Sequence, residues 1–173
     1  ILSLANNTVK NYMNSPWKSN SIPGNDVRCI YKDTHGNIWI GTEKGLSIFD
    51  DKKEEFIVPS HLPQELRNSY VFDIYQTDDD KLWIGTELNG IFIIDLKRDF
   101  LRPLEKEMNI EHIITSDNIN YSLANSTVRS IFQDEFGNIW IGTLGGGLQC
   151  LNPGTGEFTT YKISNSGIIS NHI

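Results

Sequence analysis

One short stretch recurs three times along this chain of 173 residues, and it constrains the fold more than any other feature of the sequence. Each copy holds an apolar triplet centred on tryptophan, and Gly-Thr follows the triplet directly. The copies span residues 35–42, 79–86 and 136–143. A chain built in this way is expected to contain three similar structural units.

The triplets themselves predict β-strands that are buried on both faces. They are too short for helices, and their residue types favour strands. Side chains alternate along a strand, so Ile38 and Ile40 point one way and Trp39 points the other. Because both faces are apolar, these strands are expected in sheets that are covered on both sides.

Turn signals and further apolar segments surround each triplet. Residues 33–37 and 134–138 combine Asp with Gly-Asn, as is typical of a hairpin turn. The middle copy has Asp80 in the glycine position, which Asp tolerates better than most residues. Three more strands complete a four-stranded antiparallel meander around each triplet. They are expected at 27–31, 46–49 and 56–58, at 71–75, 91–94 and 100–102, and at 128–132, 148–151 and 158–161.

The repeat length indicates the architecture. Trp39, Trp83 and Trp140 are separated by 44 and 57 residues, and a four-stranded unit of roughly 40–50 residues is typical of a propeller blade. The predicted fold is all-β, a β-propeller segment with full blades at 27–58, 71–102 and 128–161. Residues 1–12 are expected to end a preceding blade, and residues 162–173 to lead into the next. Loops are expected at 59–70 and 103–127, the second with helical turns near 104–110.

Composition excludes several classes of function. The formal net charge is −7 and the sequence pI is about 5.0, which argues against nucleic-acid partners and anionic membrane surfaces. A run of 18 apolar residues, as a membrane span would require, does not occur. Cys29 and Cys150 fall in different units, so two buried free thiols are expected rather than a disulfide. Since closed propellers have about four to eight blades, we expect a partial propeller that belongs to a larger protein.

The first and third units closely resemble the two-component regulator propeller repeat. The resemblance is carried by residues 27–46 and 128–148, by the lead-in at 122–128 and by the Gly-rich turn at 142–147. The second unit departs from the repeat at Thr77, Asp80 and Lys81, and has Gly90-Ile91 where the repeat has Gly-Leu. The resemblance extends over nearly the whole chain.

This resemblance implies a role in sensing. In that family the repeats build the extracytoplasmic sensor of membrane-bound histidine kinases. Many of these are hybrid two-component systems of gut Bacteroidetes that detect oligosaccharides from polysaccharide breakdown. Such sensors typically carry two seven-bladed propellers, an immunoglobulin-like domain, a membrane span and cytoplasmic kinase and regulator domains. The chain would then be part of one periplasmic propeller. Its partners would be an oligosaccharide or another small molecule, the rest of the propeller and the parent sensor, and in one arrangement a second copy.

Candidate ligand-binding residues follow from the blade geometry. Turns between second and third strands, and loops between blades, are expected to share one face, which would carry Glu43, Glu87 and Leu144 among other residues. Aromatic rings and planar polar groups suit sugars. The alternative is that the aromatic side chains only cover blade ends. The candidates on this face are Trp17, Lys44, Tyr70, Asn89, Asn118 and Tyr121.

Two arginines form a separate candidate set. Arg28 and Arg129 occupy equivalent places near the start of the innermost strands, with Asp73 as the expected counterpart in the second blade. They could line the axial channel and bind an anionic ligand, or they could form ion pairs between blades.

Nothing in the sequence indicates catalysis, a metal or a cofactor. The four histidines lack zinc-ligand spacing, the acidic run 78–80 lacks the rest of a calcium loop, and the glycines at 145–147 lack the lysine of a phosphate loop. Two alternatives to a ligand sensor stay open. One is a protein-interaction or dimerisation scaffold. The other is a propeller lyase or hydrolase, for which the sequence offers little material.

Overall fold

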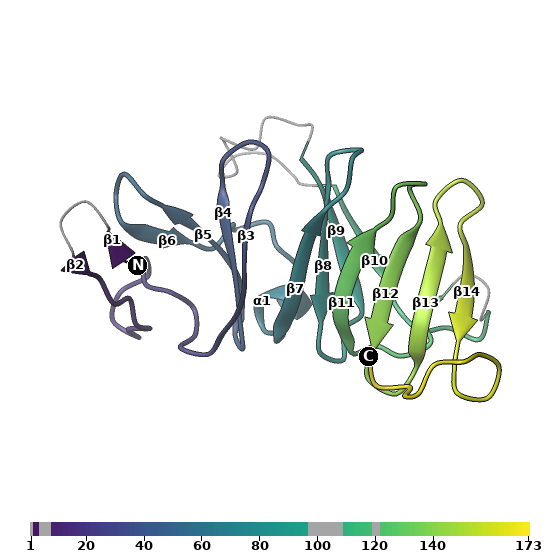
Figure 1. Ribbon diagram of the computed structural model, residues 1–173. Coiled ribbons are helices and arrows are strands. Elements are labelled where there is room, and N and C mark those ends of the chain that lie inside the picture. The colour runs from purple at the N-terminus through teal and green to yellow at the C-terminus, as the bar shows by residue number, and fades with distance from the viewer. Residues whose placement is uncertain (1, 4–7, 97–108, 119–121) are drawn as a thin grey trace.

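The computed structural model describes residues 2–3, 8–96, 109–118 and 122–173. Its regular structure is almost entirely β-strand, arranged in three four-stranded antiparallel sheets that stand in a row (Figure 1). A two-stranded pair, β1 (Leu2–Ser3) and β2 (Thr8–Val9), lies beside the first sheet. The predicted all-β fold is therefore confirmed.

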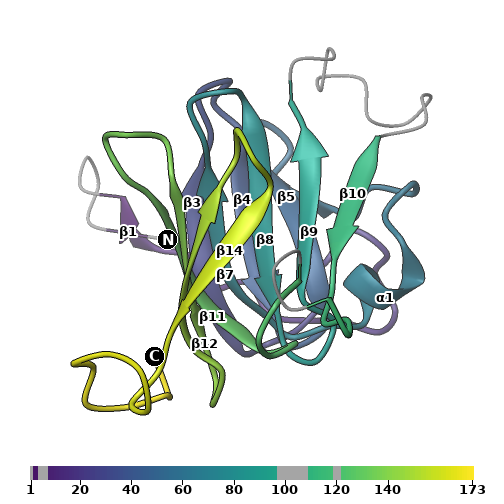
Figure 2. The same cartoon turned by 90° about the vertical axis from the view of Figure 1, so that its right-hand side faces the viewer.

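Each sheet is a meander whose strands follow the order of the chain. The first strands of the three sheets, which we call the inner strands, lie next to one another, and β9 and β10 spread away from them (Figure 2). The first sheet contains β3 (Val27–Lys32), β4 (Ile38–Thr42), β5 (Gly45–Asp50) and β6 (Glu55–Ile57). The second contains β7 (Val71–Gln76), β8 (Lys81–Thr86), β9 (Ile91–Asp95) and β10 (Ile110–Ile113). The third contains β11 (Val128–Gln133), β12 (Ile139–Thr143), β13 (Gly147–Asn152) and β14 (Glu157–Tyr161).

Two connecting segments differ from the prediction. The outer strand expected at 100–102 lies outside the described residues, as do nearly all of the helical turns expected near 104–110. Instead, β10 pairs with β9 and comes from the segment that was expected to be a loop. Between the first two sheets, the expected loop 59–70 contains a single helical turn, α1 (Gln64–Arg67), because Pro63 precedes it and Leu66 is fully buried against the sheets.

Two hydrophobic cores lie between neighbouring sheets. The core between the first and second sheets includes Trp39 and Phe92, and the core between the second and third includes Trp83 and Ile141. Trp39 and Ile40, on opposite faces of the first sheet, are 0% and 7% exposed, and Trp83 and Ile84 of the second are 6% and 0% exposed. The predicted burial of both faces is therefore confirmed in the first two sheets.

The glycine after each apolar triplet permits this close approach. A Cβ atom on Gly41 would lie 2.7 Å from Cγ1 of Val71 and 2.5 Å from Sγ of Cys29. On Gly85 it would lie 2.9 Å from Cγ1 of Val128. The first residue of each following inner strand therefore packs directly against a glycine, and any side chain there would push neighbouring sheets apart.

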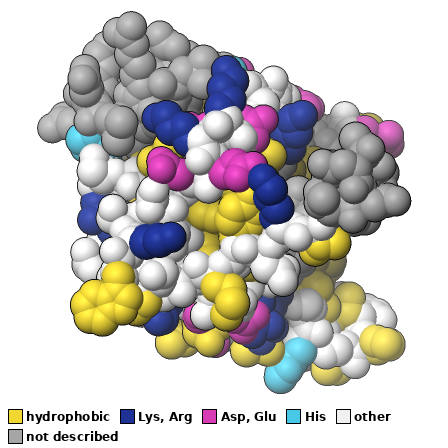
Figure 3. All heavy atoms as spheres, turned by 90° about the vertical axis from the view of Figure 1, so that its left-hand side faces the viewer, with side chains coloured by type: hydrophobic (Ala, Val, Ile, Leu, Met, Phe, Trp, Pro, Cys, Tyr) yellow, Lys and Arg dark blue, Asp and Glu magenta, His cyan; other side chains and the backbone are white. Residues whose placement is uncertain are grey.

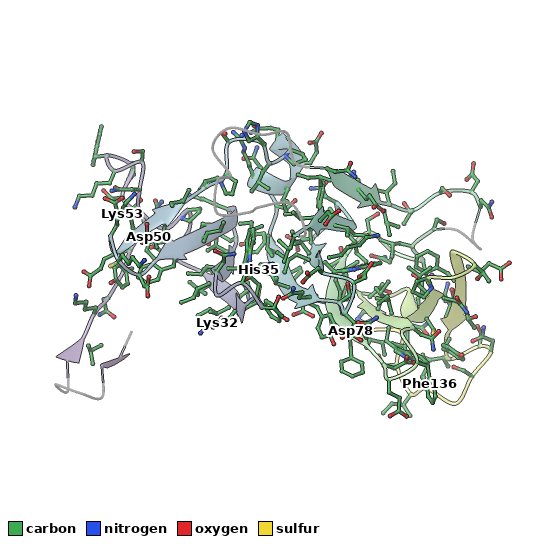
Figure 4. The ribbon with its side chains drawn as sticks, turned by 90° about the horizontal axis from the view of Figure 1, so that it is seen from above. Lys32, His35, Asp50, Lys53, Asp78 and Phe136 are labelled. Carbon is green, nitrogen blue, oxygen red and sulfur yellow. The ribbon has the colours of Figure 1, made fainter. Side chains whose placement is uncertain are left out.

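The turns between first and second strands explain the Asp and Trp of the repeat. Asp33 accepts hydrogen bonds from the backbone N–H of His35 (3.0 Å) and Asn37 (2.8 Å) and from Nε1 of the buried Trp39 (2.8 Å). One carboxylate thus closes the turn and satisfies the indole. Asp134 makes the matching bonds to Phe136, Asn138 and Trp140. Figure 4 looks down on this end, where His35, Asp78 and Phe136 mark the three successive turns.

The second sheet lacks this bond. Thr77 stands in the aspartate position, and its hydroxyl donates to the carbonyl of Lys81 at 3.1 Å. Nε1 of the buried Trp83 consequently has no hydrogen-bond partner in the part of the chain that the structure describes. Asp80 adopts a φ of 67°, so it replaces glycine in the turn as predicted.

At the opposite end, hydrogen bonds tie each sheet to the next. We call the segment before each inner strand its lead-in loop. The turn of the first sheet between second and third strands donates from Glu43 to the carbonyl of Asp26, in the sheet's own lead-in loop, at 3.2 Å. The same turn donates from Gly45 to the carbonyl of Ser69, in the following lead-in loop, at 2.8 Å. The other two sheets repeat both bonds, from Glu87 to Tyr70, Gly90 to Ser126, Leu144 to Thr127 and Gly147 to Asn171.

Candidate functional site

A β-bulge recurs at the second residue of every inner strand. In β3, Val27 pairs with Thr42 and Cys29 with Gly41, so Arg28 is left out of the register. Phe72 of β7 and Arg129 of β11 are left out in the same way. A bulge re-aims the side chain that it releases, and bulges are frequent beside functional sites. Three equivalent side chains are thus released at the same end of three adjacent strands.

This register corrects one sequence expectation. Asp73 was expected to be the counterpart of the two arginines in the second sheet, but the bulge makes Phe72 their counterpart. Asp73 instead corresponds to Cys29 and Ser130. Alignment of the first residue of each inner strand, Val27, Val71 and Val128, would have found Phe72.

The released side chains form a continuous strip with Tyr70. The guanidinium carbon of Arg28 lies 5.7 Å from the centre of the Tyr70 ring. The Tyr70 and Phe72 rings are stacked, with centres 6.1 Å apart. The guanidinium carbon of Arg129 lies 4.3 Å from the centre of the Phe72 ring. We call these four residues, which come from all three sheets, the arginine–aromatic strip.

The arginines therefore join the sheets through aromatic rings. They do not form the expected ion pairs between blades in the described part of the chain. Arg28 does make an ion pair, at 2.6 Å, but with Asp26 of its own lead-in loop. Arg129 has no ion-pair partner among the residues that the structure describes. Both arginines are exposed, and a cation over an aromatic face contributes about 0.5–1 kcal/mol at exposed sites.

The residues after the first two bulges, Cys29 and Asp73, fix the strands beneath the strip. The Asp73 carboxylate accepts hydrogen bonds from the backbone N–H of Ile131 on the neighbouring sheet (2.7 Å) and of Ile74 (2.9 Å). Burial raises the pKa of this carboxyl above its usual range. The Cys29 thiol donates to the carbonyl of Val71 at 3.8 Å. Burial, with a smaller effect from the charge of Asp73, raises the pKa of Cys29 to about 12. A thiol so held is a structural group rather than a nucleophile.

Two of the predicted polar residues on the loop face hold the loops together. Nδ2 of Asn89 donates to the Ser69 hydroxyl at 2.7 Å, and the backbone carbonyl of Asn89 accepts from Nε2 of His112 at 2.7 Å. The Glu43 carboxylate accepts from the backbone N–H of Asn25 (3.2 Å) and Asp26 (2.9 Å). Both side chains are occupied within the protein.

The remaining candidates lie apart from the strip in the described contacts. Trp17 is 93% exposed in the lead-in loop of the first sheet. Lys44 and Asn118 are exposed, and Glu87 is half-buried. Tyr121 lies outside the described residues. Figure 3 views the molecule from the side of the first sheet, where hydrophobic side chains gather in the middle of the face and along its lower margin.

A pocket of about 380 Å³ lies between the third sheet and its lead-in loop, and sequence reasoning missed it. Gln149 is fully buried at its wall. Its amide oxygen accepts from the N–H of Ala124 at 2.7 Å, and its amide nitrogen donates to Ser122 and Thr160. These bonds use the buried amide within the protein and leave the strip as the stronger binding candidate. The lining residues are Thr115, Ser116, Leu123, Ala124, Gln149, Thr160, Lys162 and Asn165.

The described residues include no helix that is long and apolar enough to span a membrane. Both cysteines are free, as predicted, but they are half-buried rather than fully buried.

Comparison with known proteins identifies the repeats. The sequence model described as "two component regulator propeller" matches residues 21–44, 65–88 and 122–145. Each match ends in the turn between second and third strands and contains one bulge of the strip. No curated protein matches the chain.

Among solved structures, the chain is similar to the extracellular domains of two B. thetaiotaomicron proteins described as hybrid two component systems. It is 51% identical to that of BT3049, with a TM-score of 0.66, over 85% of this chain and 16% of the other. It is 24% identical to that of BT4673, with a TM-score of 0.68, over 86% and 20%. The chain thus spans less than a quarter of either domain.

A more distant neighbour supports the fold alone. PorZ of Porphyromonas gingivalis, described as a bacterial surface component of the type-IX secretion system, is 16% identical with a TM-score of 0.52. The match covers 92% of this chain and 31% of PorZ.

Proposed function

Since the chain belongs to the two component regulator propeller family, we propose that it is part of the extracytoplasmic, ligand-sensing propeller of a hybrid two-component system. The observation that carries this proposal is the 51% identity to one such extracellular domain over 85% of the chain. The ligand would be an oligosaccharide from polysaccharide breakdown, and the parent protein would stand in the inner membrane with this part in the periplasm.

The arginine–aromatic strip supplies the kind of surface that such a ligand needs. Tyr70 and Phe72 offer aromatic rings, and Arg28 and Arg129 offer planar groups with several donors each. Because three sheets contribute, a ligand bound here would contact three blades at once. Binding could then favour one arrangement of neighbouring blades over another, which is the differential affinity that signalling requires.

The role proposed for this chain is binding. Cys29, with its raised pKa and its bond to Val71, serves packing. Histidine kinase activity would reside elsewhere in the parent protein, and the regulator propeller would carry only the signal.

The test is direct binding to the complete extracellular domain. Isothermal titration calorimetry with a panel of oligosaccharides, grouped by backbone sugar, should give saturable heat with at least one group. A reporter gene under the control of the parent system should respond to the same group. Saturable binding and response to another metabolite, with none to saccharides, would overturn the ligand class. A dimer that buries the loop face and binds no small molecule would favour an interaction scaffold instead.

A further inference from the structure

Two guanidinium groups flank a pair of stacked rings in the arginine–aromatic strip, and they differ in how they are occupied. Arg28 is held by Asp26 at 2.6 Å. Arg129 rests on the Phe72 ring at 4.3 Å, is exposed, and has no carboxylate partner in the described part of the chain. One face of its guanidinium lies over the ring.

We propose that Arg129 anchors an acidic group of the ligand, so that the saccharide taken by this strip carries a carboxylate or a sulfate. This inference rests on the proposed function and names the chemical class of its ligand. An arginine that is pre-oriented on an aromatic face loses little freedom when it binds, and its donors match the two oxygens of a carboxylate or sulfate.

The surroundings make this cationic group distinctive. The chain carries a formal net charge of −7, so general attraction of anions to the protein surface is not expected. An anion would be selected by this local group. The bulges support this interpretation. They release Arg in β3 and in β11 and Phe in β7 between them, so one apolar surface lies between two cations.

A purely structural role is the alternative that the experiment must exclude. In that role Arg129 only joins the second and third sheets through Phe72, and its charge has no ligand. The two roles differ in the effect of a neutral, polar replacement. Arg129→Gln would lower stability slightly in both cases, but only anion binding would make the affinity for acidic and neutral saccharides diverge.

The experiment uses the complete extracellular domain and three matched ligand series of the same length. These are oligogalacturonates, sulfated oligosaccharides and neutral oligosaccharides. We expect one acidic series to bind better than the neutral one, with an affinity that falls as salt is raised. Arg129→Gln should weaken that binding by about ten- to a hundredfold, because a charge-assisted hydrogen bond is lost. Arg129→Lys should recover part of it, since charge is restored without the planar fork.

Controls separate the possible failures. Lys52→Gln removes one exposed charge from the turn at the end of β5, away from the inner strands, and should leave the affinity unchanged. Thermal unfolding of each variant reports whether it folds. Equal binding of Arg129→Gln and the parent, or an equal loss in Lys52→Gln, would overturn the inference. Binding of neutral saccharides alone would also overturn it and leave the saccharide-sensing role intact, whereas a response to no saccharide would overturn the saccharide class of the proposed function as well.

Discussion

The bond between Asp33 and the Trp39 indole offers a sharp test of how the repeat stabilises a blade, because the second sheet lacks it naturally. Removal of the carboxylate in Asp33→Ala leaves the N–H of a fully buried tryptophan without its 2.8 Å acceptor. An unsatisfied buried donor costs about 1–3 kcal/mol. The turn also loses its bonds to the N–H groups of His35 and Asn37, which water can reach. We expect a total loss of about 2–4 kcal/mol.

A double-mutant cycle isolates the indole bond from the rest. Asp33→Ala, Trp39→Phe and the double variant should show a coupling of about 1–2 kcal/mol, because Phe removes the donor that Asp33 serves. The matched control is Thr77→Ala with Trp83→Phe. It should show a coupling close to zero, since Nε1 of Trp83 has no partner in the described structure.

Local opening is the quantity to measure, because a large multi-blade protein does not unfold in two states. Native-state hydrogen exchange of peptides from β4 and β8, in the full-length protein, reports the opening free energy of each blade. An increase of about 1.4 kcal/mol slows exchange tenfold. Equal coupling in the two cycles would refute the view that the repeat's aspartate acts through its tryptophan.

Three further predictions concern packing and protonation. Gly41→Ala should destabilise its blade by about 1–3 kcal/mol through overpacking against Cys29 and Val71. Gly36→Ala, whose added Cβ would meet nothing within 4 Å but whose φ is 89°, should cost only about 1 kcal/mol of backbone strain. A larger loss of opening free energy than in Gly41→Ala, measured by hydrogen exchange of β4 peptides, would contradict this account. The pKa of Cys29 is raised to about 12. Its alkylation by iodoacetamide at pH 8, followed by mass spectrometry, should therefore be roughly a thousandfold slower than that of a free thiol. A normal rate would show that the thiol is not buried in solution. Hydrogen bonds from Asn138 and Trp140 lower the pKa of Asp134, so its stabilising contribution is present above the unfolded pKa of about 3.9 and is lost as pH falls through the lower folded value. The difference in the opening free energy of β12 between the parent and Asp134→Asn, measured by hydrogen exchange, should therefore shrink between pH 7 and pH 3, and a constant difference would exclude the titration.

The architecture could be predicted because local and global signals agree in this chain. The triplet around Trp39 is apolar on both faces, Gly41 follows it, and Asp33 precedes it, so strand, turn and stacking all follow from one short motif. The register within each blade is fixed for the same reason, since a slip by one residue would turn Trp39 and Ile40 to the wrong faces.

The candidate site was harder to predict, because a bulge leaves little trace in a sequence. The sequence pattern of β7 predicts Asp73 as the counterpart of Arg28, whereas the residue that the bulge releases is Phe72. That shift of one position hid the aromatic half of the strip. The outer strand of the second sheet was missed for a different reason. β10 is only four residues long, carries Glu111 and His112 at its centre, and pairs with β9 across a long connection, so neither periodicity nor turn residues mark it.

The paired backbone bonds at the loop end have a consequence for how such proteins change over time. Every blade presents a donor to its own lead-in loop and another to the loop that follows, as Glu43 and Gly45 do for Asp26 and Ser69. The boundary between two neighbouring blades is therefore held by the same kind of hydrogen bonds, whichever two blades meet there. A whole repeat can be duplicated or deleted in a gene while the hydrogen bonds between the remaining blades stay compatible, so propellers with different numbers of blades can arise from one repeat.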